Sequence, residues 1–210
     1  MSNKIIEVEI RGALTEDSYI NLTAYLKDNA VLIKKQNRFL LDYSTFLEGI
    51  GERKTDVRVR KTNGKVEIIV KKGKFGGTSR EEVSVFPEGD SFESTLRLMN
   101  MLGYSKAVAC DRSITRYKIE DIEIAIQDVI DFSDSRNIHS RFFEAEIMCN
   151  DDEKEKEKAV EKIRTFLSKH KLIEFSEQEW NDYVFKMNKE ANGVFDYQTD
   201  NIDKIINLGV

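Results

Sequence analysis

Proline, cysteine and long apolar runs are scarce in this chain of 210 residues. The single proline, Pro87, leaves no Pro-rich linker that would separate domains. Two cysteines, Cys110 and Cys149, are too few and too far apart for a zinc motif or a disulfide framework, which favours a reduced, cytoplasmic protein. No stretch approaches the roughly 20 apolar residues of a membrane-spanning helix, so no membrane partner is expected.

A basic excess is also missing, because 38 acidic residues outnumber 33 lysines and arginines and the formal net charge is −5. Non-specific nucleic-acid binding needs a basic surface that displaces counterions, so no nucleic-acid partner is expected. The length suits one sizeable core, and we predict a single domain over residues 1–210, as a monomer or homodimer.

Residue patterns predict a β-rich α+β fold. The pair Asn63-Gly64 lies between two alternating runs, which is the strongest short-range signal for a hairpin. The order of strand, helix and meander occurs twice, which predicts half-barrels of about 1–90 and 91–150, then helices over 151–192 and a tail over 193–210. We therefore expect a closed or near-closed, eight-stranded antiparallel β-barrel covered by helices. The predicted strands cover about 4–12, 30–41, 55–61, 66–72, 81–86, 105–119, 122–130 and 140–148, and the helices 15–29, 90–102, 151–171 and 175–191.

Charged residues recur on one face of these strands. In the first strand Glu7, Glu9 and Arg11 share a face, because successive side chains of a strand point to opposite sides. An isolated charged pair usually marks a solvated face, whereas five such strands in one chain favour an interior site under outer helices. The other charged faces carry Arg58 with Arg60, Arg80 with Glu82, Arg112 with Arg116, and Glu144 with Glu146.

The mixture of carboxylates and guanidinium groups predicts a metal and phosphate site. Carboxylate oxygens suit hard cations such as Mg²⁺ or Mn²⁺, and Mg²⁺ commonly binds through few carboxylates together with substrate phosphates. Arginine is suited to bidentate phosphate contacts.

Two features of the C-terminal third do not enter this prediction. The alternating charges from Asp151 onward favour a solvated helix face over a protein-interaction scaffold, and Trp180, Tyr183 and Met187 have a spacing typical of packing.

These motifs resemble the CYTH family of triphosphate tunnel metalloenzymes, which includes class IV adenylyl cyclases and thiamine triphosphatases. The resemblance covers about residues 4–190 in the correct order. Its elements are Glu7-Val-Glu9-Ile-Arg11, Leu40-Leu41-Asp42-Tyr43-Ser44, Arg58-Val-Arg60 with the Asn63-Gly64 hairpin and a strand ending at Lys71, Ser79-Arg80-Glu81-Glu82, and Phe142-Phe-Glu144-Ala-Glu146.

The resemblance implies a metal-dependent triphosphatase that hydrolyses an organic or inorganic triphosphate inside the barrel. Thiamine triphosphate, a nucleoside triphosphate or tripolyphosphate are the implied substrates, and Mg²⁺ or Mn²⁺ the implied cofactor. Arg11 and Glu82 are the implied catalytic residues, Glu82 by orienting a basic neighbour. The implied metal ligands are Glu7, Glu9, Glu144, Glu146 and Gln127, and the implied triphosphate ligands are Arg11, Arg58, Arg60, Lys71, Arg80, Arg112 and Arg116.

Three positions depart from the family pattern. Arg11 replaces a lysine that positions or activates water, Ile114 replaces a basic residue, and Gln127 replaces a metal-binding aspartate. A one-residue bulge would instead turn the neighbouring Asp128 inward. These departures leave two alternatives to hydrolysis open: a tunnel that binds a nucleotide or polyphosphate without turnover, and a class IV-type adenylyl cyclase.

Overall fold

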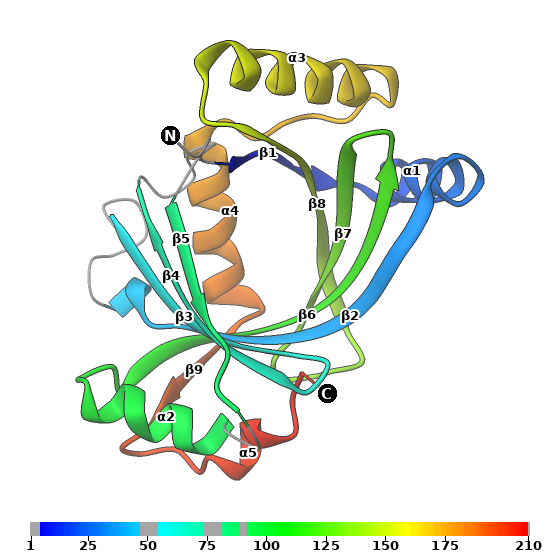
Figure 1. Cartoon of the computed structure of the whole chain (residues 1–210). Coiled ribbons are helices and arrows are strands. Elements are labelled where there is room, and N and C mark those ends of the chain that lie inside the picture. The colour runs from blue at the N-terminus through cyan, green and yellow to red at the C-terminus, as the bar shows by residue number, and fades with distance from the viewer. Residues whose placement is uncertain (1–4, 47–53, 74–80, 89–91, 210) are drawn as a thin grey trace.

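A computed structural model describes residues 5–46, 54–73, 81–88 and 92–209 of the chain (Figure 1). The strands are β1 Ile5–Leu14, β2 Val31–Asp42, β3 Thr55–Thr62, β4 Lys65–Lys72, β5 Glu81–Val85, β6 Lys106–Ile119, β7 Ile122–Ile130, β8 Ile138–Asn150 and β9 Gly193–Asp196. The helices are α1 Glu16–Asn29, α2 Phe92–Met101, α3 Glu153–Lys169, α4 Glu177–Glu190 and α5 Asp203–Ile206, with a 3₁₀ turn η1 over Ser44–Phe46. The predicted elements are present, and β9 and α5 are additions in the tail.

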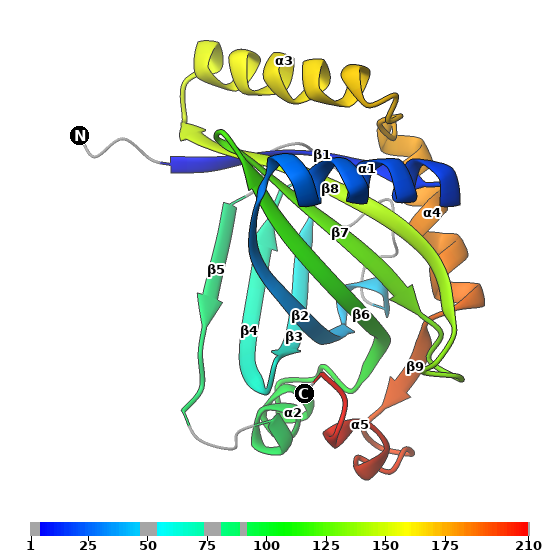
Figure 2. The same ribbon diagram turned by 90° about the vertical axis from the view of Figure 1, so that its right-hand side faces the viewer.

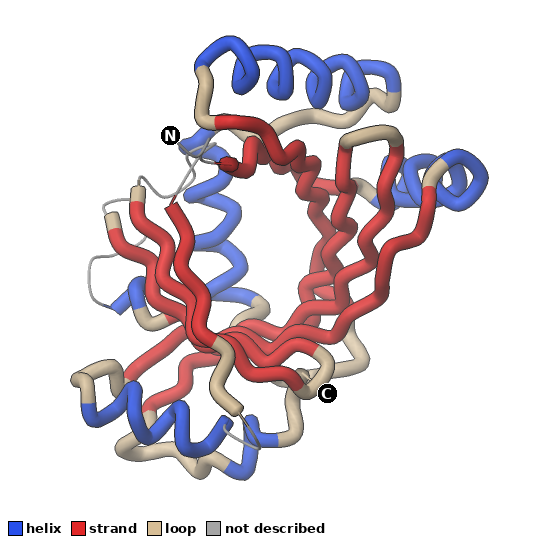
Figure 3. The backbone as a smooth tube through the Cα atoms, in the orientation of Figure 1, coloured by secondary structure: helices blue, strands red, loops and turns tan. Residues whose placement is uncertain are grey.

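The strands form one strongly curled antiparallel sheet (Figure 3). Its order is β1-β8-β7-β6-β2-β3-β4-β5, and β9 pairs with the first residues of β6, Lys106–Ala109. Within the described ranges, no hydrogen bonds join the edge strands β1 and β5. The predicted near-closed antiparallel barrel is therefore confirmed.

The charged faces of the strands point into the barrel, and the apolar faces point outward under the helices. Along the pairing of β1 with β8, Glu9 lies opposite Glu146 and Arg11 opposite Glu144. The alternate residues Ile10, Phe143 and Ala145 pack outward with residues of α1 and α3 (Figure 2). Each large apolar side chain buried in this way stabilises the fold by roughly 1.5–3 kcal/mol. Helical cover therefore explains why the polar face became the interior.

A second apolar cluster orients the strands on the other side of the barrel. Phe39, Leu41 and Val59 are fully buried there, together with Phe92 and Leu96 of α2. Because the side-chain period of a strand is two, anchoring Phe39 and Val59 outside turns Arg38, Arg58 and Arg60 inward. The basic wall of the barrel is thus a consequence of the packing of β2 and β3 on α2.

The connection from β3 to β4 is the tight hairpin that the Asn-Gly pair predicts. Asn63 and Gly64 have φ values of 45° and 79°, the left-handed conformation that a type I′ turn requires at both central positions. The side chain of Asn63 accepts a hydrogen bond of 2.8 Å from the backbone N–H of Asn37, which ties the turn to β2. This fixes the register in which Arg58 and Arg60 are presented.

Helix α4 covers one end of the barrel (Figures 1 and 2). Ser176 and Glu179 begin it with a capping box, in which each side chain accepts from the other's backbone N–H. The chain before it crosses β1 closely: the Phe175 N–H donates to the Arg11 carbonyl at 2.7 Å, and a Cβ at Gly12 would lie 2.0 Å from the Ile173 carbonyl oxygen. The position of α4 is therefore set by the strand that carries Glu9 and Arg11.

No helix in the described part of the chain is both long and apolar enough to span a bilayer.

Candidate functional site

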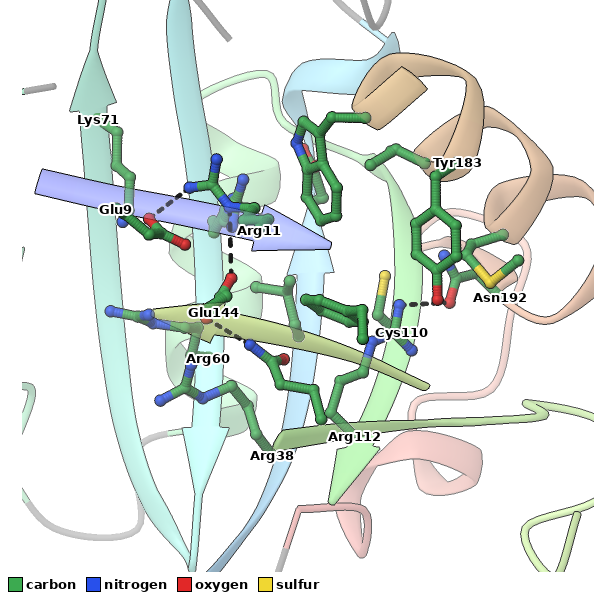
Figure 4. Close-up of a pocket in the computed structure, with 18 of the residues that line it drawn as sticks. Glu9, Arg11, Arg38, Arg60, Lys71, Cys110, Arg112, Glu144, Tyr183 and Asn192 are labelled. Carbon is green, nitrogen blue, oxygen red and sulfur yellow. Dashed lines mark hydrogen bonds and ion pairs between the residues drawn. The ribbon is translucent and has the colours of Figure 1, made fainter. Parts of the chain in front are cut away.

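The interior of the barrel is a cavity of about 310 Å³, within the size range of small-molecule sites (Figure 4). Every residue that the sequence predicts for the site and that the structure describes lines this cavity. They are Glu7, Glu9, Arg11, Arg58, Arg60, Lys71, Glu82, Arg112, Arg116, Gln127, Glu144 and Glu146. Arg80, also predicted, lies outside the described residues. The strand periodicity thus brings side chains from most of the sheet to one place.

An acidic group lies where β1 meets β8. Arg11 pairs with Glu9 and, from its Nε, lies 3.5 Å from the Glu144 carboxylate (Figure 4). Burial raises the pKa of Glu9 well above its usual value against the pull of Arg11, and the negative charges of Glu144 and Glu7 raise it further. For Glu144, burial also opposes ionisation, but Arg11 and a hydrogen bond from Glu9 hold its pKa below the usual value. The pKa values of these two neighbouring carboxyl groups are therefore shifted in opposite directions beside one guanidinium.

Glu146 continues this acidic wall towards β7. The Arg116 guanidinium lies 2.8 Å from Glu146 and 2.5 Å from Glu123. Burial raises the pKa of Glu146 to about 7 in spite of Arg116, and the nearby carboxylates of Glu7 and Glu144 add to the increase. The carboxyl groups of this wall thus outnumber its arginines, and burial together with their mutual repulsion disfavours full ionisation.

The opposite wall, on β3, β4 and β5, holds cations that are oriented by carboxylates. Asp56 binds Arg58 in a bidentate manner, and Glu67 does the same to Arg60 at 2.9 Å for both bonds. Such pairs fix the plane of a guanidinium and leave its remaining N–H groups for a ligand. Glu82 lies 2.5 Å from Lys71 and 3.6 Å from Arg60, so it contacts two basic neighbours.

Arg38 is a site residue that the sequence interpretation missed. It lies directly opposite Arg112 in the pairing of β2 with β6 (Figure 4). Arg38 donates to the Thr62 hydroxyl at 3.1 Å, and Arg112 to the Asn192 side chain at 3.0 Å. Among the described residues no carboxylate lies within ion-pair distance of either. Burial, followed by the charges of Arg60 and Arg116, lowers the pKa of Arg38 to about 10, because the attraction of Glu144 and Glu67 is smaller than these effects.

The structure also settles which of two neighbours on β7 faces the interior. Gln127 is buried, lines the cavity and donates from its amide to Glu144. Asp128 points outward, where it accepts a bond of 2.8 Å from Arg141. The irregularity in this strand pair lies between Val129 and Ile130, so no bulge turns Asp128 inward. Ile114, opposite Gln127, is fully buried.

The donor set fits a hard divalent cation that is bound together with a phosphate. The Oε1 atom of Glu9 is buried and has no hydrogen-bond partner, which is a costly state for a carboxylate oxygen. Yet in the described ranges no three His, Cys, Asp or Glu residues are arranged to hold a metal ion. A cation at Glu9 and Glu144 therefore needs oxygens from a ligand and from water, which is the usual coordination of Mg²⁺.

The end of the cavity under α4 is aromatic. Trp180 and Tyr183 line it, and Met187 is buried against Phe142. The sequence interpretation assigned these three helix residues to packing; all three line the cavity, and Trp180 and Tyr183 also pack on Phe142. The sequence cannot show that these residues line a cavity, because apolar residues at helical spacing have the same pattern over a filled core and over a cavity.

Neither a protein-family model nor a curated protein sequence matches the chain. Solved structures do match. The PH1819 protein from Pyrococcus horikoshii is 17% identical with a TM-score of 0.66, over 86% of this chain and 98% of that one. A proposed adenylate cyclase from Vibrio parahaemolyticus is 16% identical with a TM-score of 0.56, over 83% and 91% of the two chains. HpAC1 from Hippeastrum, for which a dominant triphosphatase activity is described, is 13% identical with a TM-score of 0.52, over 81% and 90%.

At these identities the likeness establishes the fold. The fold that the resemblance in the sequence implies is therefore confirmed, and the likeness says nothing beyond the fold. Function has to be argued from the site, because one fold can carry unrelated activities.

Proposed function

We propose that this protein binds the triphosphate group of a small molecule inside the barrel and hydrolyses it with Mg²⁺ or Mn²⁺. The observation that carries the proposal is the pair Arg38 and Arg112, which occupy opposed positions of β2 and β6, line the cavity and, among the described residues, have no carboxylate within ion-pair distance. Like charges at opposed positions of a sheet destabilise it, and a polyanion between them removes the repulsion.

The remaining cationic side chains extend this corner, so that successive phosphate groups of one ligand can each contact a cation. Arg58 and Arg60 are held in plane by their carboxylates, and Lys71 and Arg116 flank them in the same cavity. Preorganised donors of this kind stabilise the negative charge that accumulates on a transferred phosphoryl group without reorganising during the reaction.

Glu9 and Glu144, with Glu7 and Glu146 beside them, would hold the divalent cation. Such a cation polarises a phosphoryl oxygen and lowers the pKa of a bound water. Arg11 stays protonated, so its contribution is to orient Glu9 and Glu144 and to donate to a phosphate oxygen. The neutral Gln127 favours a weakly held cation that enters with the substrate.

Phosphate release from tripolyphosphate, ATP and thiamine triphosphate, each with Mg²⁺ or Mn²⁺, tests the proposal. We expect release that disappears in Glu9→Gln and Glu7→Gln. The exposed neighbour Glu81→Gln, on the outer face of β5, serves as the control and keeps full activity. A wild-type protein that releases no phosphate from any of the three contradicts hydrolysis.

Binding without turnover is the second candidate, and Arg11 supports it. Its guanidinium already pairs with Glu9 and Glu144, the two carboxylates that a cation requires. Tight tripolyphosphate binding by calorimetry, together with no phosphate release, would establish this alternative. Cyclase activity would appear as pyrophosphate release from ATP.

A further inference from the structure

Strand β5 is an edge of the sheet with little of the protection that edge strands usually have. Within the described residues it pairs with β4 alone, and it is the outermost strand on the left of Figure 2. Natural proteins guard such edges with lysine, proline, a bulge or a covering segment, because the unpaired N–H and C=O groups recruit another strand. The sequence of β5 is Glu-Glu-Val-Ser-Val, and its register with β4 is regular from Glu81 to Val85. Charge is therefore confined to its first two positions.

The other open edges of the sheet are guarded. In β2, pairing with β3 begins only at Arg38, and the part before it carries Lys34, Lys35 and an irregularity next to Leu32. Towards the end of β1, the chain before α4 crosses the strand and donates a hydrogen bond to the Arg11 carbonyl. Strand β9 has only four residues, and very short edge strands recruit partners poorly. Among the described strands, β5 is thus the edge best able to accept another strand.

The surface of β5 is also apolar and open to solvent. Val83 and Val85 are 60% and 57% exposed, and Phe86, directly after the strand, is 66% exposed. Their neighbours on β4, Val70 and Ile68, pack against the apolar cluster that includes residues of α2. The apolar outer surface therefore continues from the core of the protein to its open edge, where burial against a partner would stabilise a complex.

The sequence of β5 is complementary to a second copy of itself. Homo-oligomers most often form around a two-fold axis, where one strand pairs antiparallel with the same strand of the other copy. With the axis at Ser84, Val83 of each copy lies opposite Val85 of the other, and Glu82 lies opposite Phe86. Opposed β-branched side chains stabilise a strand pair, whereas opposed like charges destabilise it. This register joins the valines of both copies into one apolar group and sets no carboxylate against another.

We propose that β5 is a homodimer interface, in which two copies pair this strand antiparallel around an axis at Ser84 and join their sheets. The proposal does not depend on the triphosphate site. It links the dimer to the basic wall of the cavity, because Ser84 donates to Glu67 at 2.6 Å and Glu67 accepts two bonds from Arg60. A strand of five residues gives a small interface, so we expect a Kd of about 10 µM.

Analytical ultracentrifugation of the full chain, from about 1 to 300 µM, brackets this Kd and measures the dimer directly. Val83→Lys should raise the Kd at least about tenfold, because lysine at a strand edge opposes pairing. Val83→Ile, which keeps a β-branched side chain, should retain the dimer. Val31→Lys is the matched control, because Val31 is a 71% exposed valine on the guarded edge of β2, and it should leave the Kd unchanged. At low concentration, where all four proteins are monomers, their Tm values should agree within about 2 °C, which shows that the variants are folded.

Amide hydrogen exchange tests the pairing itself in the wild type. The main-chain N–H groups of residues 82–86 that point away from β4 should exchange more slowly at about 300 µM than at about 1 µM, because the second copy protects them. Amides in the first half of β2 should exchange equally at both concentrations.

A wild type that stays monomeric up to about 300 µM overturns the proposal, as does a Val83→Lys variant with the Kd of the wild type. Loss of the dimer in Val31→Lys with its retention in Val83→Lys would place the contact on β2. A dimer that forms without slower exchange in β5 also overturns it, since the strands are then not paired.

Discussion

Replacing Arg38 with methionine should stabilise the empty protein and weaken its ligand binding at the same time. The lowering of the Arg38 pKa from its usual value to about 10 corresponds to roughly 3 kcal/mol against the charged form. Water in the cavity screens part of this, so we expect a gain of about 1–2 kcal/mol in the free energy of unfolding. For a chain of this length that is a rise in Tm of roughly 4 °C. Methionine keeps an unbranched apolar stem like that of arginine and removes the charge.

With tripolyphosphate bound, the wild type should become more stable than Arg38→Met. A ligand at 100 times its Kd adds about 2.7 kcal/mol to the stability of the protein that binds it. Loss of the charge-assisted bonds of Arg38 should weaken tripolyphosphate binding by about 2 kcal/mol, so the variant gains far less from the same concentration.

Thermal unfolding with and without tripolyphosphate measures both effects in one experiment. Lys35→Met, an exposed position of the same strand, controls for loss of a charge and should shift Tm by less than about 2 °C in either condition. A decrease in the Tm of empty Arg38→Met, or an unchanged ligand response, would refute the view that Arg38 is an uncompensated anion-binding group.

Three further predictions concern how the site is held. Asp56→Asn should lower the stability by about 3 kcal/mol in urea unfolding and weaken tripolyphosphate binding, because Arg58 loses its buried partner; unchanged stability would mean that the pair is not formed. Gln127→Asp should tighten Mn²⁺ binding in the presence of tripolyphosphate by about tenfold, measured by electron paramagnetic resonance, since a carboxylate replaces a neutral amide; no change would place the cation elsewhere. Gly12→Ala should cost about 3 kcal/mol, because its Cβ would meet the Ile173 carbonyl oxygen; a wild-type Tm would show that the crossing relaxes freely.

The sequence predicted most of the fold and of the charged site because both depend on a local period. Glu9 and Arg11 share a face through the period of two in their strand, and five such strands allow one common interior. Arg38 escaped this reasoning because its strand begins with the apolar run Val31-Leu32-Ile33 and does not alternate until its second half. Its role depends on Arg112, which is distant in the sequence and opposite in the sheet.

Other features depend on tertiary contacts alone. Strand β9 has only four residues, too few for a pattern, and it exists through its pairing with β6. The exposure of Trp180 inside the barrel depends on where α4 lies across the opening, which its helical stripe does not encode. The same stripe would describe a helix over a filled core.

The crossing of the chain over Gly12 has a consequence for how this protein can diverge. The contact between Phe175 and Arg11 fixes the start of α4 against the strand that carries the acidic residues. Substitutions along the inward face of α4 therefore act on a helix whose first turn keeps its position on β1. Substitutions on α4 and substitutions on the strands can consequently alter different ends of the cavity one at a time.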